Sequence, residues 1–392
     1  MLRKIKNIYH LCLAILANAL YGWPSRKLKV IGVTGTDGKT TTVYLIYHLL
    51  KSAGFKVSMV SSIGATINDK IYDTGFHVTT PSSFSLQRLF KEAKKHNVDY
   101  FVLEVTSHAL DQNRVWGVPF KIGVLTNVTN EHLDYHKTYE DYLKTKKKLL
   151  RTALTGVVNK DDGSYTYLSD LEKKKGLKNW IAYKMPLDIK FSSEKLSSGF
   201  NKYNASAAIA VCRFLKIKDA DIKKGLESFV LPPGRMDFVY TKEFKIMIDF
   251  AHTPNAFLQL LSFLRPLTGG RIIHVFSSAG ERDKTKRPEM GKISSDFANI
   301  IILTSEDSRR ESTEKINEEI MKGIKNPVTQ ILKITDRQKA IDKAIELAEA
   351  EDLVLLTGKA HEKSMNLGHG EEPWDEYEAV KKALEKRGLS YE

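Results

Sequence analysis

The segment Thr34–Thr42 carries residue types that bind phosphate groups. It reads Thr-Gly-Thr-Asp-Gly-Lys-Thr-Thr-Thr and directly follows the apolar run 29–33. A glycine-rich turn before a helix presents backbone N–H groups to phosphate, and the helix dipole favours the negative charge. Lys39 is placed to reach terminal phosphates, and the hydroxyl of Thr40 is placed to bind Mg²⁺. The strict spacing of such a loop fails at Val33, where a first glycine is expected, but the strand–turn–helix context still predicts a nucleotide site.

Two further segments place carboxylates and histidines directly after predicted strands. Glu104 ends the apolar run 100–103, and residues 126–136 read Thr-Asn-Val-Thr-Asn-Glu-His-Leu-Asp-Tyr-His. A third segment, 249–254, reads Asp-Phe-Ala-His-Thr-Pro. The carboxyl ends of strands in an α/β sheet border the crevice where ligands bind. Each residue alone could be an ordinary loop residue, but together they indicate divalent-metal and phosphate chemistry.

The elements that must position these residues alternate between strands and helices from residue 28 onward, which is typical of an α/β fold with mostly parallel sheets. In the first part, strands are predicted at 28–33, 100–105 and 122–126, with helices at 40–53, 140–150 and 204–215. Residues 155–200 are less regular. After Pro232-Pro233-Gly234, strands at 246–250, 272–276, 300–304 and 353–357 alternate with helices at 254–264, 292–298, 314–324 and 338–350. We predict a P-loop ATPase domain over 28–232, then a smaller Rossmann-like α/β domain over 233–392, with a ligand cleft between them.

The composition excludes several classes of protein. The chain has 392 residues, 42% of them hydrophobic and 28% charged, which is an ordinary globular balance. Its only cysteines, Cys12 and Cys212, exclude a disulfide scaffold and a Cys-based zinc site, and they fit a reducing cytoplasm. The net charge is +14, but the basic runs at 144–148 and 173–175 lack interleaved aromatic residues. We therefore expect phosphorylated small ligands and no nucleic acid.

Residues 1–27 are predicted to form an amphipathic helix. Six apolar residues follow helical spacing: Ile8, Leu11, Cys12, Ile15, Leu16 and Ala19. We expect this face to dock on the body of the protein. A membrane-surface contact and a secretion signal are the alternatives, because Arg3, Lys4 and Lys6 precede the apolar stretch. The stretch is shorter than the roughly 20 apolar residues that a membrane span needs, so no transmembrane segment is expected.

Seven motifs in a fixed order resemble those of the Mur ligases, ATP-dependent enzymes that join amino acids to peptidoglycan precursors. The motifs are Gly35-Thr-Asp-Gly-Lys-Thr-Thr41, Glu104-Val-Thr-Ser-His-Ala-Leu110, the segment 126–136, Gly234-Arg-Met236, the segment 249–254, Glu281-Arg-Asp-Lys-Thr-Lys-Arg-Pro288 and Gly358-Lys-Ala-His-Glu362. They run from about residue 28 to the end of the chain. The resemblance implies a role in cell-wall synthesis, and hence in cell shape and division.

The resemblance also implies roles for individual residues. ATP would contact Gly35, Thr36, Asp37, Gly38, Lys39, Thr40, Thr41, Asn201, Asn204, Arg235 and Asp249. Mg²⁺ would be held by Thr40, Glu104, His132 and Lys146, the last as a carbamate. The muramoyl-peptide would contact Thr79, Thr80, Ser107 and Arg114. The incoming amino acid would contact His252, Arg282, Asp307, Arg309 and Glu362. Lys39, Glu104, His132, Lys146 and Arg235 are the expected catalytic residues.

The chemistry that these residues can perform is amide ligation. A carboxylate is a poor electrophile, so ATP must first convert it to an acyl phosphate, which an amine then attacks. Phosphoryl transfer of this kind depends on positioning and on charge neutralisation, which Mg²⁺, Lys39 and Arg235 would supply. By resemblance, the acceptor would be UDP-N-acetylmuramoyl-L-Ala-D-Glu and the added amino acid meso-diaminopimelate or L-lysine. We expect a cytoplasmic monomer that acts on these two substrates.

The sequence departs from the family pattern in three places. One is Ala360 in Gly358-Lys-Ala360, where the family usually has a second glycine. The N-terminal domain that grips the uridine nucleotide in these enzymes is not expected here, because the phosphate loop begins at residue 35. Glu306-Asp307-Ser308-Arg309 stands where members that add meso-diaminopimelate carry Asp-Asn-Pro-Arg. Three alternatives therefore stay open: a folylpolyglutamate-type ligase, a cyanophycin-type ligase and a nucleotide-binding pseudoenzyme.

Overall fold

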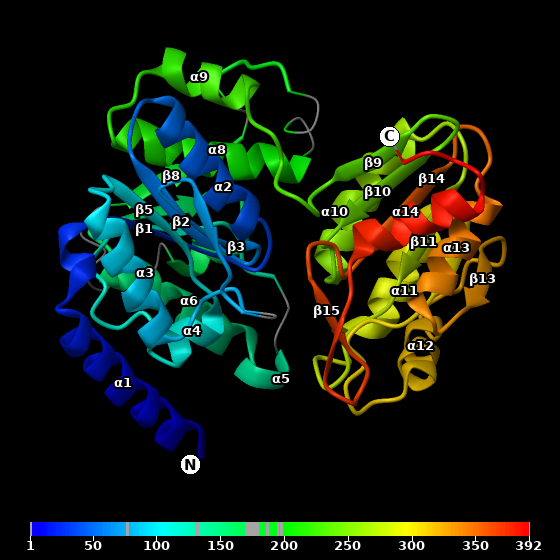
Figure 1. Cartoon of the computed structure of the whole chain (residues 1–392), viewed down its shortest axis with the longest axis horizontal. Coiled ribbons are helices and arrows are strands. Elements are labelled where there is room, and N and C mark those ends of the chain that lie inside the picture. Colours follow the sequence, from blue (N-terminus) through cyan, green and yellow to red (C-terminus); the bar gives the residue numbers. More distant parts are fainter. Residues whose placement is uncertain are drawn as a thin grey trace. The chain divides into compact units, whose positions relative to one another are not determined.

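A computed structural model describes residues 2–75, 78–129, 133–168, 180–185, 188–193, 196 and 199–391. The chain divides into two compact units, Met1–Val230 and Leu231–Glu392 (Figure 1). Each unit has its own sheet and its own apolar core. The phosphate loop lies in the first unit, and the motifs from Gly234 onward lie in the second.

The first unit is built on a mixed sheet with the strand order β4-β3-β2-β5-β1-β6-β7-β8. Its strands are β1 (Lys29–Thr34), β2 (Val57–Ser61), β3 (Gly64–Ile67), β4 (Lys70–Tyr72), β5 (Tyr100–Glu104), β6 (Phe120–Leu125), β7 (Thr155–Asn159) and β8 (Trp180–Tyr183). The strands from β2 to β8 in this order pair in parallel, whereas β3 and β4 are antiparallel additions at one edge. The central strands β1, which is buried except for Lys29, and β5, which is fully buried, therefore end side by side. Their carboxyl ends carry the phosphate loop and Glu104.

Helices cover both faces of this sheet (Figure 1). They are α1 (Leu2–Tyr21), the short 3₁₀ helix η1 (Pro24–Lys27), α2 (Lys39–Ser52), α3 (Ser83–Lys95), α4 (Ser107–Asp111), α5 (Leu133–His136), α6 (Tyr139–Thr152), α8 (Gly199–Phe214) and α9 (Asp219–Glu227). Helix α2 packs against α8 and α9, whereas α6 packs against α4 and α1 packs against α3. Polar side chains start several of them: Ser82, Thr106 and Thr138 each accept a hydrogen bond from a first-turn amide.

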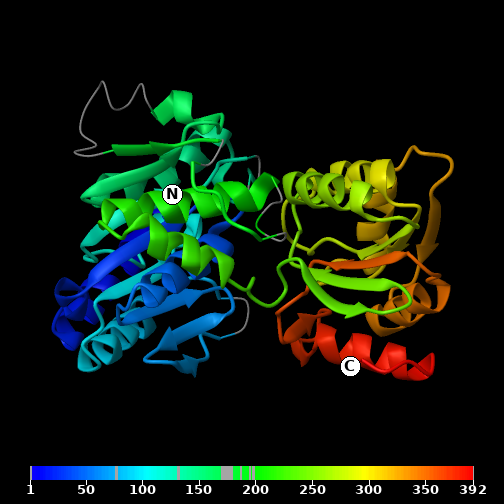
Figure 2. The same cartoon turned by 90° about the horizontal axis from the view of Figure 1, so that it is seen from above.

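The second unit repeats the layered design with the strand order β13-β12-β11-β14-β10-β9. Its strands are β9 (Asp237–Thr241), β10 (Lys245–Asp249), β11 (Ile272–Phe276), β12 (Ile300–Leu303), β13 (Gln330–Lys333), β14 (Leu353–Thr357) and the hairpin β15 (Ser364–Asn366) with β16 (Glu371–Pro373). Its helices are α10 (Pro254–Leu264), the short 3₁₀ helix η3 (Arg265–Leu267), α11 (Lys286–Phe297), α12 (Thr313–Met321), α13 (Arg337–Leu347) and α14 (Glu376–Lys386). Figure 2 shows α14, in red, on the opposite side of the strands from α10 and α11.

The predicted α/β class, with a large mostly parallel sheet followed by a second sheet, is confirmed. One helix begins earlier than the sequence pattern indicated: α11 starts at Lys286 rather than at residue 292. Pro288 reads as a helix breaker, but it occupies the first turn, where the backbone N–H groups have no helical partner to lose.

The predicted helix within residues 1–27 is present as α1. The face of this helix that packs on the protein body is not the one that was predicted. Ala14, Ala17 and Asn18 are buried against the body, whereas the expected docking residues Ile8 and Ile15 are exposed. Small side chains let α1 approach α3 closely, so the larger apolar side chains point the other way. None of the described helices is both long enough and apolar enough to cross a membrane.

Candidate active site

The phosphate loop connects β1 to α2 in a tight turn. Gly38 caps α2 with φ = +79°, a left-handed conformation that glycine adopts without strain. A Cβ atom at Gly38 would lie 2.1 Å from Oδ1 of Asn204, and one at Gly35 would lie 1.8 Å from Oγ1 of Thr126. Both glycines are therefore required by close packing around the loop.

The loop after β6 holds the phosphate loop in shape. The Thr36 amide donates to the Asn127 carbonyl at 3.0 Å, and the Asp37 amide donates to Oδ1 of Asn127 at 2.9 Å. Thr126 returns a hydrogen bond from its hydroxyl to the Asp37 carbonyl at 2.7 Å. The ammonium group of Lys39 donates to the Thr36 carbonyl at 2.7 Å, so it lies over the turn in which a phosphate would sit.

Three oxygen-bearing side chains meet beside the first turn of α2. The Thr40 hydroxyl donates to Oε2 of Glu104 at 3.0 Å and shares a hydrogen bond of 3.1 Å with the Ser62 hydroxyl. The Ser62 amide also donates to Oε2 of Glu104, at 3.1 Å. Hard oxygen donors of this kind suit Mg²⁺, so this cluster fits the ion that the family resemblance implies. Ser62 was not predicted, because it follows β2, a short strand without a motif of its own.

Lys146 is buried directly behind the phosphate loop. It is 1% exposed, its ammonium group donates to the Gly35 carbonyl at 2.5 Å, and it lies 4.2 Å from the centre of the Tyr142 ring. Its neighbours Lys144 and Lys148 are exposed on the same helix. The structure thus separates the predicted Lys146 from the surface lysines that surround it in the sequence. Tyr142, which the sequence did not single out, shares this buried position.

Two predicted asparagines on α8 reach the same loop. Asn204 accepts a hydrogen bond from the Thr42 hydroxyl at 3.3 Å and donates to Oδ1 of Asn201 at 3.1 Å. Both side chains are buried, as is Thr41 on the first turn of α2. Two of the distant segments that the sequence assigned to the nucleotide site, the phosphate loop and α8, therefore meet at α2.

The predicted acceptor residues lie together at the carboxyl end of β5. The Thr80 hydroxyl donates to the Glu104 carbonyl at 2.9 Å, and its carbonyl accepts from the Arg114 guanidinium at 3.0 Å. Ser107 and His136 share a hydrogen bond of 3.1 Å between Oγ and Nε2. Thr79, beside Thr80, is half-buried. Burial lowers the pKa of the Arg114 guanidinium, yet the group stays cationic at neutral pH and offers a positive charge to an anionic acceptor.

One predicted metal ligand, His132, lies outside the described residues. Among the residues that are described, no group of three His, Cys, Asp or Glu side chains forms a ready-made metal cluster. The oxygen cluster around Glu104 fits a partly hydrated Mg²⁺, because this ion usually takes only one or two protein carboxylates.

In the second unit, Arg235, Asp249 and His252 gather around the start of β9 and the end of β10. Asp249 accepts hydrogen bonds of 2.7 Å from the Met236 and Ala251 amides, and burial raises the pKa of its carboxyl. The Arg235 guanidinium lies 4.7 Å from the centre of the Phe250 ring. His252 pairs through Nδ1 with the Phe250 carbonyl at 2.8 Å. Asp249 therefore already fixes the backbone of the Gly234-Arg-Met236 motif.

A second group in this unit forms where β12 and β14 end. The buried Lys359 ammonium donates to Asp307 at 3.0 Å and to Glu362 at 2.6 Å. Asp307 also accepts the Asn366 amide at 3.0 Å, and the Arg309 amide donates to the Asn366 carbonyl at 2.9 Å. Asp307, Arg309 and Glu362 are thus brought together as the sequence predicted, through Lys359 and Asn366, which it did not assign.

Next to Asp307, Glu306 is a buried carboxyl in an unusual setting. Its Oε2 atom has no hydrogen-bond partner among the described residues, and a Cβ atom at Gly358 would approach it to 2.9 Å. Burial raises the pKa of Glu306, and Asp307 raises it further. The second glycine that the resemblance leads one to expect is Ala360, which lies close to Gly234 instead.

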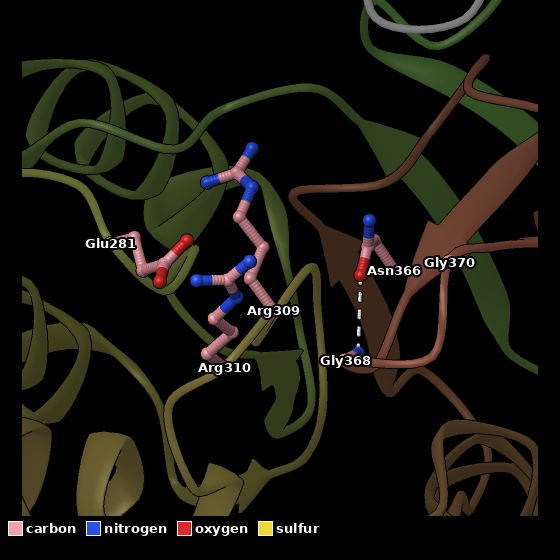
Figure 3. Close-up of a pocket in the computed structure, with 6 residues that line it drawn as sticks. All are labelled: Glu281, Arg309, Arg310, Asn366, Gly368 and Gly370. Atoms are coloured by element: carbon pink, nitrogen blue, oxygen red, sulfur yellow. Dashed lines mark hydrogen bonds between the residues drawn. The ribbon is translucent and has the colours of Figure 1, made fainter.

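A pocket of about 300 Å³ opens beside this group. Its lining residues are Glu281, Arg309, Arg310, Asn366, Gly368 and Gly370. Figure 3 shows the side chains of Arg309 and Arg310 between Glu281 on one wall and Asn366 on the other. Arg309 donates to the Gly280 carbonyl at 2.6 Å from a left-handed backbone conformation, φ = +51°. Arg282 is exposed and follows Glu281 in the same loop.

The first unit has a phosphate loop beside an oxygen cluster, and the chain continues into a second unit with a mostly parallel sheet. These features define the class of P-loop α/β proteins. Comparison with known families narrows this class. Residues 33–191 match the "Mur ligase middle domain", and residues 234–360 match the "Mur ligase, glutamate ligase domain". The chain belongs to the Mur ligase family.

Several curated relatives align over nearly the whole chain. A UDP-N-acetylmuramoyl-L-alanyl-D-glutamate--2,6-diaminopimelate ligase from Clostridium botulinum is 36% identical, and the alignment covers 95% of this chain and 81% of that protein. The enzyme of the same name from Aquifex aeolicus is 38% identical, over 94% and 80%. A UDP-N-acetylmuramyl-tripeptide synthetase from Borrelia garinii is 38% identical, over 94% and 78%.

Solved structures share the fold. A UDP-N-acetylmuramoyl-L-alanyl-D-glutamate--2,6-diaminopimelate ligase aligns with a TM-score of 0.60 and 27% identity, over 93% of this chain and 79% of that one. E. coli FolC in complex with ADP aligns with a TM-score of 0.70 and 18% identity, over 90% of both chains. Because the identity to E. coli FolC is only 18%, that similarity shows a shared fold and nothing more.

Proposed function

We propose that this protein is an ATP-dependent amide ligase that adds an amino acid to UDP-N-acetylmuramoyl-L-Ala-D-Glu in peptidoglycan precursor synthesis. The reaction activates the acceptor carboxylate as an acyl phosphate and releases ADP and phosphate. The observation that carries this proposal is the contact of Thr40 with Glu104 beside the phosphate loop, in a chain whose relatives bear the names of such ligases.

In this proposal the first unit binds ATP. The backbone of Gly35, Thr36, Asp37 and Gly38 surrounds the phosphates, and Lys39 leaves the Thr36 carbonyl to pair with them. Thr40, Glu104 and Ser62 hold Mg²⁺, which supplies charge neutralisation at the phosphates when it is bound. Thr41, Asn201 and Asn204 support the nucleotide from α2 and α8. Arg235 and Asp249, in the second unit, are proposed as nucleotide contacts on the family resemblance alone.

Lys146 and His132 complete the proposed metal site. Lys146 is buried at the loop, where a carbamate would replace its positive charge by a carboxylate-like ligand. The existing hydrogen bond from Lys146 to Gly35 shows how near its side chain lies to the phosphate loop. This carbamate, and the roles of His132 and Lys146 as ligands, are our proposal.

The acceptor is proposed to bind over the carboxyl end of β5, through Thr79, Thr80, Ser107 and Arg114. Arg114 provides a cation for a peptide carboxylate, and its guanidinium is fixed by Thr80 and by Gln112 at 2.9 Å. A carboxylate held in this place lies on the same strand end as Glu104. That arrangement favours attack on a phosphate whose charge Lys39 neutralises.

The incoming amino acid is proposed to be meso-diaminopimelate, with L-lysine as the main rival. The far end of meso-diaminopimelate carries both a carboxylate and an ammonium group. The pocket offers Arg309 and Arg310 to the first and Glu281 to the second. L-lysine would present only an ammonium group, which two guanidinium groups repel. His252, Arg282, Asp307 and Glu362 are the remaining proposed contacts.

The decisive experiment is an acceptor and amino-acid panel, read as ADP and phosphate release. We expect turnover only when UDP-N-acetylmuramoyl-L-Ala-D-Glu and an amino acid are both present, and a product longer by one residue in the mass spectrum. Lys39→Ala should lower turnover by orders of magnitude, because it removes the charge that meets the phosphoryl group. Turnover with a folate or a polyaspartate acceptor instead would refute the proposal.

We also expect the protein to be a monomer. We expect it in the cytoplasm, because its proposed substrates are ATP and a nucleotide-linked precursor.

A further inference from the structure

Helix α1 carries an exposed apolar stripe along its outer face. The stripe consists of residues at helical spacing, namely Ile5, Ile8, Tyr9, Cys12, Ile15, Leu16, Ala19 and Leu20. Their large apolar members are between 41% and 67% exposed. Exposed apolar side chains scattered singly are normal, but a continuous row over roughly four helical turns marks a binding surface.

The opposite face of α1 is anchored, so the stripe cannot turn inward. Asn18 donates to the Trp116 carbonyl at 3.0 Å, and Asn7 donates to the Asp111 carboxylate at 3.1 Å. The Asn113 side chain donates back to the Asn7 carbonyl at 3.3 Å. Buried small residues, Ala14 and Ala17, complete this contact. The orientation of the stripe therefore follows from the packing of the unit.

The surroundings of the stripe are strongly basic. Residues 2–21 contain no aspartate or glutamate. Six exposed basic side chains lie on α1, η1 and the adjacent helix α3: Lys6, Arg26, Lys27, Arg88, Lys91 and Lys94. Lys91 lies 5.8 Å from the centre of the Tyr21 ring, which places the basic side of α3 next to α1. The acid of α3, Glu92, is already paired with Lys95 at 2.9 Å.

We propose that this basic, apolar surface of α1 binds an anionic lipid bilayer, with α1 lying in the plane of the interface. An apolar stripe inserts among acyl chains, and flanking lysines and arginines attract anionic headgroups. The charges also argue against a second copy of the chain as the occupant, because two such basic surfaces would repel each other. One face of α1 is already used by the body, which excludes insertion across the bilayer.

Docking in this way would position the proposed acceptor site close to the membrane surface. The segment that α1 holds, from Asp111 to Trp116, includes Arg114. The proposal does not depend on the reaction, because the surface is defined by α1, η1 and α3 alone. Membrane binding would determine the location of the protein in the cell.

Only one of the two native cysteines is exposed, which makes the test direct. Cys12 lies within the stripe and is exposed, whereas Cys212 is buried. A polarity-sensitive fluorophore on Cys12 should therefore report insertion of the stripe in the full-length chain. We expect its emission to shift to shorter wavelength with vesicles that contain phosphatidylglycerol, and much less with pure phosphatidylcholine vesicles. Added salt should weaken the binding, because it screens the basic side chains.

Matched variants distinguish binding through this surface from non-specific adsorption of the protein to vesicles. Ile15→Glu combined with Leu16→Glu should lower the vesicle affinity by about tenfold or more, since it places two charges in the stripe. Ile71→Glu alters a residue that is 85% exposed elsewhere in the unit, and it should leave the affinity unchanged. Arg88→Glu with Lys91→Glu should weaken binding chiefly at low salt. All variants should keep the turnover of the unaltered protein without lipid, which verifies folding.

Three results would overturn the proposal. The first is an emission of the Cys12 label that does not respond to anionic vesicles. The second is equal binding of the Ile15→Glu/Leu16→Glu variant and the unaltered protein. The third is a shift that grows with protein concentration in the absence of lipid, which would assign the stripe to contact between two copies of the chain.

Discussion

The hydroxyl of Thr40 donates a hydrogen bond of 3.0 Å to Glu104, across 64 residues of sequence. This bond links the first turn of α2 to the end of β5. It exists because β1 and β5 are parallel neighbours in register, with Val33 beside Glu104. The two loops that follow these strands must then meet at one edge of the sheet. Ser62 joins them because β2 pairs with β5 on the other side.

Glu104→Gln tests whether this contact is a metal site. Glutamine can still accept the Thr40 hydrogen bond, but it lacks the charge that holds a divalent cation. We expect turnover to fall by about 100-fold or more and the Mg²⁺ concentration for half-maximal turnover to rise. Phosphate release across a Mg²⁺ titration provides the measurement. Glu92→Gln, at a half-buried position on α3, is the control. An unchanged Mg²⁺ dependence in Glu104→Gln would argue for a purely structural contact.

Lys146→Ala tests the proposed carbamate. Turnover should drop by at least about 100-fold, because the variant loses a ligand beside the phosphate loop. Acetate should then restore part of the activity by supplying a carboxylate in the vacated space. Lys144→Ala lies on the same helix with an exposed side chain, so it should keep normal turnover with and without acetate. Full activity of Lys146→Ala would leave Lys146 as a packing residue only.

Much of the fold could be predicted from the sequence because its strongest signals are local. Apolar runs marked β1, β5, β11 and β14, and the glycine turn marked the start of α2. Short or partly exposed strands such as β3 and β13 carry no such run, so they were not anticipated. The early start of α11 was hidden by a proline that the first helical turn tolerates.

The positions of candidate-site residues could be predicted where a motif and a strand end coincide, as at Lys39, Glu104 and Asp307, whereas their roles stay predictions. Such positions could not be predicted where tertiary packing decides them. Ser62, Tyr142 and Arg310 have no spacing signal, and only the sheet order or the pocket brings them to the site. The face of α1 was misjudged because periodicity identifies an apolar face but does not say whether the protein itself covers it.

Arg310→Ala tests the choice of amino acid. Removing one of the two guanidinium groups in the pocket should raise the KM for meso-diaminopimelate by about tenfold or more, while kcat falls less. Discrimination against L-lysine should shrink in the same variant, because the repulsion of its ammonium group is reduced. Side-by-side turnover with the two amino acids provides the measurement. Lys381→Ala, on the exposed side of α14, controls for the loss of one positive charge, and a preference for L-lysine in the unaltered protein would refute the assignment.

His274 makes the stability of the second unit depend on pH. Its ring is buried in β11, where Nδ1 pairs with the Ser294 hydroxyl at 2.8 Å and Nε2 with the Thr357 hydroxyl at 3.0 Å. Burial, together with the nearby positive charge of Arg337, lowers its pKa to about 3. The ring is therefore neutral in the folded protein at every pH above that value, whereas in the unfolded chain it takes up a proton near pH 6.5.

The sign of the effect follows from this difference in proton binding. Between pH 6.5 and pH 3 the unfolded chain binds more protons than the folded one, so the free energy of unfolding decreases as the pH falls. The contribution of His274 approaches about 1.4 kcal/mol per pH unit in this window.

Urea unfolding at a series of pH values, together with hydrogen exchange at the amides of β11 and β14, should show this dependence of stability on pH. His274→Gln removes the titrating group and should flatten the slope between pH 6.5 and pH 5, although it lowers stability at pH 7. His369→Gln alters an exposed histidine and should leave the slope unchanged. Equal slopes in His274→Gln and the unaltered protein would mean that other groups cause the acid sensitivity.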